Sequence, residues 1–159
     1  MPAFSYASGT STVPLLGETI GENFHRIVAA YPDREALVDR GSARRFSYQQ
    51  LADEVEACAL GLLERGIQPG DRVGIWAPSC AEWVFVQYAT AGIGAILVNI
   101  NPAYRTHELG YVLKQAGIRL LVAAPAFKTS DYRAMVADVR ADTQTCAACC
   151  SSATRTGRA

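Results

Sequence analysis

The stretch "RVGIWAPSCAEWVFVQYATAGIGAILVNI" (72–100) decides the fold, because it holds two apolar runs with a helical pattern between them. "RVGIW" (72–76) is a short run of the kind found in strands that are buried on both faces. Ser79 and Glu82 have the spacing of a capping box, which predicts the start of a helix. "GAILVNI" (94–100) is the second apolar run. The order strand, helix, strand is typical of a unit whose strands run parallel.

The same alternation continues downstream. Thr106 is placed to cap a helix over "HELGYVLKQA" (107–116), and "RLLVAA" (119–124) is a third apolar run of the buried kind. Ser130 then precedes a last amphipathic stretch. Strands and helices that alternate over 72–140 predict an α/β fold, with a parallel sheet, right-handed crossovers and helices on both sides.

The residues before this unit predict two more helices and a hairpin. Apolar side chains recur at helical spacing from Thr19 onward. "EALVD" (35–39) and "RRFS" (44–47) then form a short hairpin. Ser47 opens a second amphipathic helix through a capping box, and Gly66 ends it.

Composition excludes several classes of function. Lys and Arg number 15 and Asp and Glu number 15, so no net charge attracts nucleic acid. No apolar run reaches the roughly 18 to 20 residues that span a bilayer, and the first 21 residues lack the basic and apolar segments of a secretion signal. The default location is the cytoplasm, where Cys58 and Cys80 are expected to be small buried thiols.

Three cysteines, Cys146, Cys149 and Cys150, gather near the end of the sequence. A structural zinc site needs four ligands, usually as two close pairs, and no second pair lies nearby. A redox pair usually lies between a strand and the start of a helix, and neither is predicted here. Residues 141–159 contain no Leu, Ile, Val, Met, Phe, Trp or Tyr, so we expect a disordered tail with reactive thiols.

The stretch "YASGTSTVP" (6–14) looks superficially like a phosphate-binding loop. It has a single glycine, no lysine nearby and no strand before it, so a lead-in along the domain surface is the favoured interpretation. Three side chains follow the predicted strands, where open parallel sheets bind ligands: Asn99, Asn101 and Lys128. Asn101 precedes a proline and is most simply a turn former, whereas Lys128 is a candidate contact for an anionic ligand.

No activated nucleophile, paired catalytic carboxylates or metal triad can be assigned from these residues. The sequence does, however, resemble one family at several stretches: "PLLGETIGENF", "YPDREALV", "FSYQQLADEV", "GIQPGDRVGIWAPSCAEWVFVQYATAGIGAILVNINPAY" and "ELGYVLKQAG". They are similar to the N-terminal part of the AMP-forming acyl-CoA synthetases of the adenylate-forming superfamily. The lead-in and "FKTSDY" are most similar to the branch that acts on medium-chain and longer fatty acids. The resemblance runs from about residue 5 to residue 140, and Cys80 departs from it, since the family usually carries Asn there.

This resemblance implies a two-step reaction. ATP and a fatty acid form an acyl-adenylate and pyrophosphate, with Mg²⁺ accompanying the ATP, and CoA then displaces AMP to give the thioester. The family's phosphate loop, its nucleotide contacts and its catalytic lysine lie further along and have no match here. The resemblance therefore assigns no catalytic residue, no metal ligand and no bound cofactor to these residues, and we expect them to be inactive alone. Lys128 is the one candidate, by position and charge, for the phosphate of CoA.

The expected organisation is an irregular lead-in (1–18), an incomplete N-terminal AMP-binding-enzyme domain (19–140) and a disordered, non-family tail (141–159). A sudden loss of apolar residues at 141 is what a shifted reading frame would produce, so we hypothesise a truncated synthetase. Two alternatives stay open: a non-catalytic α/β module that binds a nucleotide or CoA, and an interaction module that pairs with another synthetase polypeptide. We also expect low solubility and self-association through an uncovered sheet edge.

Overall fold

The computed structural model of the protein describes residues 9, 12–13 and 15–140. Its helices are α1 (Ile20–Ala30), α2 (Tyr48–Glu64), α3 (Ala81–Gly92), α4 (Thr106–Gln115) and α5 (Tyr132–Arg140). Its strands are β1 (Glu35–Asp39), β2 (Arg44–Ser47), β3 (Arg72–Trp76), β4 (Ile96–Asn99), β5 (Ile118–Ala123), β6 (Ala126–Phe127) and β7 (Ser130–Asp131). The predicted tail with its cysteines, and most of the predicted lead-in, lie outside the described residues.

A three-stranded parallel sheet with the order β4-β3-β5 is the centre of the fold. Val73 of β3 is aligned with Leu97 of β4 and with Leu120 of β5. The predicted strand 94–100 is shorter in the structure, because Gly94 turns the chain with φ +72° before β4 begins. The predicted α/β class and the parallel sheet are confirmed.

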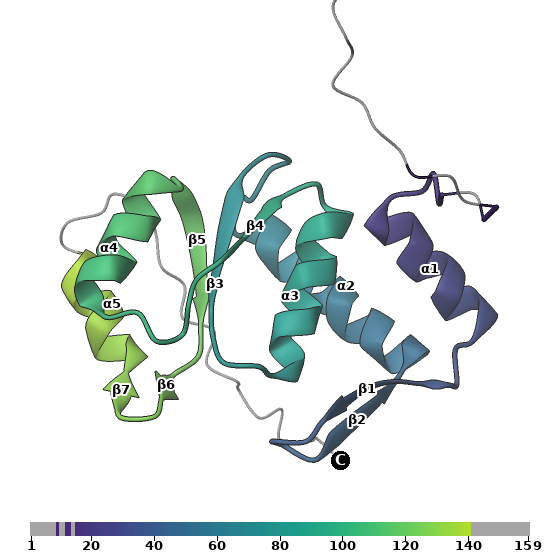
Figure 1. The fold of residues 1–159 in the computed structure, drawn as a ribbon, viewed down its shortest axis with the longest axis horizontal. Coiled ribbons are helices and arrows are strands. Elements are labelled where there is room, and N and C mark those ends of the chain that lie inside the picture. Colours follow the sequence, from purple (N-terminus) through teal and green to yellow (C-terminus); the bar gives the residue numbers. More distant parts are fainter. Residues whose placement is uncertain (1–8, 10–11, 14, 141–159) are drawn as a thin grey trace, which may run out of the picture.

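Helices cover both faces of this sheet, as predicted. In Figure 1, α1, α2 and α3 lie on one side and α4 and α5 on the other. The side chains of β3 alternate between two cores: Val73 and Ile75 pack with the first group of helices, and Trp76 packs with the second. Gly74 faces the second core, where an added Cβ would lie 3.1 Å from Ile100, so this position has no room for a side chain.

Two helices begin as the sequence indicates. At α1, the Glu22 carboxylate accepts from the Thr19 amide at 2.8 Å, and the Thr19 hydroxyl accepts from the Glu22 amide at 3.2 Å. Ser47 and Gln50 form the same reciprocal pair at α2, which confirms the predicted capping box. Each pair satisfies amide groups that a helix start leaves without partners.

The capping box predicted at Ser79 and Glu82 is wrong. The residue that precedes α3 is Cys80, whose side chain makes no capping hydrogen bond. Glu82 accepts instead from the Arg44 guanidinium at 2.6 Å, and the Asp39 carboxylate accepts from the Ala81 amide at 3.3 Å. Groups from the β1–β2 hairpin therefore take the place of the local cap.

Two further predicted caps are also wrong. Arg105, not Thr106, precedes α4, and the Glu108 carboxylate accepts from its amide at 3.0 Å. Ser130 belongs to β7, which pairs with β6 in a small hairpin that the sequence pattern did not indicate. The Asp131 carboxylate then accepts from the Ala134 amide at 3.1 Å, so an aspartate supports the first turn of α5.

Candidate functional site

The carboxyl ends of β3, β4 and β5 meet at one edge of the sheet, where open α/β sheets bind ligands. Two pockets flank the β3–α3 loop at this edge. The β5-side pocket, of about 550 Å³, lies between this loop, the β1–β2 hairpin and the end of β5. The β4-side pocket, of about 640 Å³, lies between the same loop and the residues that follow β4.

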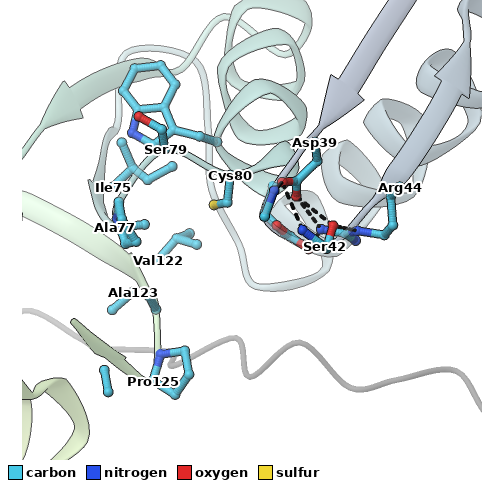
Figure 2. Close-up of a pocket in the computed structure, with 16 residues that line it drawn as sticks. Asp39, Ser42, Arg44, Ile75, Ala77, Ser79, Cys80, Val122, Ala123 and Pro125 are labelled. Atoms are coloured by element: carbon cyan, nitrogen blue, oxygen red, sulfur yellow. Dashed lines mark hydrogen bonds and ion pairs between the residues drawn. The ribbon is translucent and has the colours of Figure 1, made fainter. Parts of the chain in front are cut away.

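Most of the β5-side pocket is apolar, and its charges gather on the hairpin side. Figure 2 shows Ile75, Ala77 and Val122 on one side, with Asp39 and Arg44 on the other. The apolar wall consists of strand residues and the residues that directly follow the strands. The sequence pattern had placed no candidate residue in this pocket.

The charged side of this pocket is a connected cluster of Asp39, Arg44 and Glu82, with Ser42 beside it. The Arg44 guanidinium donates to Glu82 at 2.6 Å and to Asp39 at 3.2 Å. Asp39 also accepts from the Ser42 hydroxyl at 2.8 Å. The hydrogen bond from Ser42, with further bonds from the Ala81 amide and Arg44, lowers the pKa of Asp39 to about 2. Both carboxylates and one guanidinium leave this cluster with a net charge of −1.

This cluster makes the start of α3 a poor phosphate site. Free amides at a helix N-terminus attract anions, but here the Asp39 carboxylate already accepts from the Ala81 amide. An incoming phosphate would also face the net negative charge of the cluster. Within residues 15–140, no group of three or more His, Cys, Asp or Glu side chains could hold a metal ion. The described residues therefore do not fit ATP phosphates with Mg²⁺.

Cys80 lies between the two pockets and is half-buried. Burial raises the pKa of its thiol, so the thiol stays protonated at neutral pH. A protonated thiol is a weak nucleophile, and nothing here activates it. Cys58, on α2, is also half-buried and packs against the first core. The two thiols are thus less deeply buried than the sequence predicted.

Asn99 and Asn101 lie at the β4-side pocket, as their place after β4 predicted. The side-chain oxygen of Asn101 accepts from the Ala103 amide at 2.9 Å, which is the turn-forming role proposed for it. Its backbone carbonyl accepts from the Trp76 indole at 3.0 Å. Asn99 is exposed at the end of β4.

Lys128 lies elsewhere on this edge, in the turn between β6 and β7. Its backbone is left-handed, with φ +52°, and its ammonium lies 5.3 Å from the centroid of the Phe127 ring. It shares a shallow depression with Asp131 and Arg133, next to the β5-side pocket. The structure therefore does not bring Lys128 together with Asn99 and Asn101, which lie across β3.

Tyr132 was missed as a residue that holds this edge together. Its ring is fully buried and stacks on Trp76, with 3.5 Å between centroids and 6° between planes. Its hydroxyl donates to the Pro102 carbonyl, and burial raises its pKa. Tyr132 thereby joins the ends of β3 and β4 to the start of α5. The sequence signalled only an apolar position on a helix, because this pair is distant along the chain.

No helix in the described part of the chain combines the length and the apolar character needed to cross a bilayer. The family model described as AMP-binding enzyme matches residues 24–156. This range continues past residue 140, so the predicted boundary at that position stays a prediction.

Curated relatives agree with this family. The mitochondrial medium-chain acyl-CoA ligase ACSF2 of Macaca fascicularis is 44% identical over 128 residues, and that of Homo sapiens is 43% identical over 128 residues. Each match covers 80% of this chain and 21% of the relative, so the chain spans about a fifth of the length of these relatives.

Solved structures agree as well. The N-terminal domain of FACL13 from Mycobacterium tuberculosis has a TM-score of 0.71 and 25% identity, covering 78% of this chain and 30% of that chain. The N-terminal subdomain of Klebsiella oxytoca NpsA, solved in complex with anthranilyl-AMSN, has a TM-score of 0.61 and 30% identity. That match covers 66% of this chain and 27% of NpsA. The sheet and its helices thus correspond to an N-terminal portion of these proteins.

Proposed function

The chain belongs to the AMP-binding enzyme family, and from this premise we propose that its residues form part of the N-terminal scaffold of a fatty acyl-CoA synthetase. Such an enzyme joins a fatty acid to AMP, releases pyrophosphate, and transfers the acyl group to CoA. The observation that carries the proposal is the 44% identity over 128 residues to a medium-chain acyl-CoA ligase. The substrate is accordingly a fatty acid of medium or greater chain length.

In this proposal, ATP and Mg²⁺ are held by parts of the enzyme that residues 15–140 do not include. The supporting observations are the Asp39 carboxylate at the start of α3 and the lack of a metal-ligand group among the described residues. When bound, Mg²⁺ would stabilise the charge on the ATP phosphates. The described residues have a structural task, which is to hold the β3–α3 loop and the hairpin at the edge of the sheet.

An activity assay tests this proposal. The 159-residue chain is incubated with ATP, Mg²⁺, CoA and a medium-chain fatty acid, and pyrophosphate release is measured. We expect no release above that of a sample without fatty acid. Fatty-acid-dependent turnover would contradict the scaffold role. A full-length relative assayed in parallel shows that the reagents are competent.

We also propose that Lys128 contacts a phosphate of CoA. In its favour, Lys128 is exposed and shares a depression with Arg133, so two cations lie beside the single carboxylate of Asp131. Titration with CoA and with dephospho-CoA, followed by nuclear magnetic resonance, tests this contact. Lys128→Ala is expected to weaken the response to CoA more than the response to dephospho-CoA. Lys114→Ala, which removes the other lysine, is the matched control, and equal effects of the two variants would contradict the contact.

The compartment is part of the proposal as well. A cytoplasmic location fits the lack of predicted disulfides, whereas the two curated relatives carry the word mitochondrial in their names. Fractionation of cells that express the chain, with an antibody against it, distinguishes the two locations. Recovery in the mitochondrial fraction would contradict the cytoplasmic proposal.

A second candidate function is that of an interaction module. The observation that favours it is the open edge of β5, which pairs only with β3 within the described residues. An open edge can bind another strand.

A further inference from the structure

The outer side of β5 carries free hydrogen-bonding groups. β5 pairs with β3, and no other strand among residues 15–140 pairs with it. The Ala124 amide donates to the Trp76 carbonyl at 3.1 Å, so Ala124 directs its backbone groups toward β3. Because this direction alternates along a parallel strand, Leu121 and Ala123 direct theirs away from β3. These outward groups can pair with one more strand.

An apolar trough runs beside this edge. The β5-side pocket adjoins a second pocket, of about 300 Å³, between α2, α3 and β5. Val122 and Glu82 line both pockets, so the two are continuous. Leu120 and Phe85 contribute apolar surface to the second pocket. A strand added at the edge would have apolar surface beside it as well as backbone partners.

The two ends of this trough differ in charge. At the amino end of β5 lies Arg119, whose guanidinium is 53% exposed and lies 3.1 Å from Asp71, and Arg65 lines the trough on the same side. At the carboxyl end lies the cluster of Asp39, Arg44 and Glu82, with a net charge of −1. The edge is therefore more positive where β5 begins than where it ends.

We infer that β5 is a self-association edge, to which a second copy of this chain adds its own β5 in antiparallel orientation. A two-fold axis near Leu121 would place Arg119 opposite Ala123 of the partner subunit, so that the positive end of each copy meets the negative end of the other. Such a pairing forms about six backbone hydrogen bonds. A parallel orientation would bring like charges together. The zero net charge of the chain does not oppose association of two copies. This inference does not depend on the proposed function.

Sedimentation equilibrium on the whole chain tests the inference. The wild-type chain is expected to dimerise, and Arg119→Glu is expected to raise the dissociation constant by about ten-fold, since it reverses one charge that faces the negative end of the partner. The matched control is Arg45→Glu, which reverses an arginine in a single exposed ion pair with Glu35, away from β5. The control is expected to dimerise like the wild type. A monomeric wild-type chain, or equal effects of the two reversals, would overturn the inference.

A second measurement does not depend on a variant. Hydrogen exchange of the Leu121 and Ala123 amides is measured at low and at high protein concentration, because these amides point to the open side. Protection that rises with concentration supports pairing between copies. Protection that is the same at all concentrations would mean that the chain itself covers the edge, and the inference would be wrong. Circular dichroism of each variant confirms that it is folded.

Discussion

The two faces of the central sheet are joined to their surroundings by different interactions. On the face of α1, α2 and α3, a charged cluster of half-buried side chains ties the hairpin to the start of α3, in addition to the apolar core. On the face of α4 and α5, the buried Trp76 and Tyr132 rings stack on each other. Charges can be titrated and screened, whereas stacked buried rings depend on apolar area and shape. The two faces should therefore respond to different perturbations.

The largest expected effect is on the aromatic face. Tyr132→Ala removes a fully buried ring and leaves Trp76 without its stacking partner. We expect a loss of about 3–5 kcal/mol in the free energy of unfolding, measured by denaturant titration. Tyr111→Ala, on the surface of α4 at 62% exposure, is the matched control and should change stability by about 0.5 kcal/mol or less. Similar losses for the two tyrosines would contradict this role of the buried pair.

A smaller effect is expected on the charged face. Asp39→Ala removes the carboxylate that accepts from the Ala81 amide and the Ser42 hydroxyl. We expect Tm to fall by about 3 °C, and hydrogen exchange of the Ala81 amide to become faster. Asp53→Ala, which removes an exposed carboxylate on α2, serves as the control. Unchanged exchange at Ala81 would show that Asp39 does not support the start of α3.

Acid should weaken the charged face before the aromatic one. The folded-state pKa of Asp39, about 2, lies below the ordinary value of 3.8, so its stabilising contribution is present above about pH 4 and is lost as the pH falls towards 2. Hydrogen bonds from Arg26 and Asn23 lower the pKa of Glu18 to about 2 in the same way, near α1. We expect Tm to fall over this range, and to fall less in Asp39→Asn. An identical pH profile for that variant would contradict the contribution of Asp39.

The smallest expected effect is at the far side of the hairpin. The Arg45–Glu35 pair, at 2.6 Å, is exposed on both sides. Arg45→Ala should change the free energy of unfolding by about 0.5 kcal/mol or less, because solvent and salt screen such pairs. A much larger loss in thermal denaturation would mean that the exposed charges matter as much as the cluster around Arg44.

Local patterns in the sequence were enough to predict the sheet and its helices. The apolar runs of β3 and β5 and the helical spacing between them depend on neighbouring residues alone, and the Ser47 cap is equally local. The start of α3 could not be predicted in this way, because Asp39 reaches it from a hairpin that is distant along the chain. The stacking of Trp76 on Tyr132 is hidden for the same reason.

The candidate ligand residues divide in the same manner. Asn99 and Asn101 could be placed at the edge of the sheet, because strand ends meet there in any parallel sheet. The turn that holds Lys128 could not, since β6 and β7 have only two residues each and lack a recognisable strand pattern. The charged side of the β5-side pocket was likewise not indicated, because its members come from two separate elements.

The central claim is that residues 15–140 are scaffold, with no nucleotide site of their own. Calorimetric titration of the 159-residue chain with a non-hydrolysable acyl-adenylate analogue tests this claim most directly, because such an analogue presents the acyl and AMP groups together. We predict no binding up to concentrations on the order of 1 mM, while a full-length relative binds the same analogue. Saturable binding at micromolar concentration by this chain would contradict the claim.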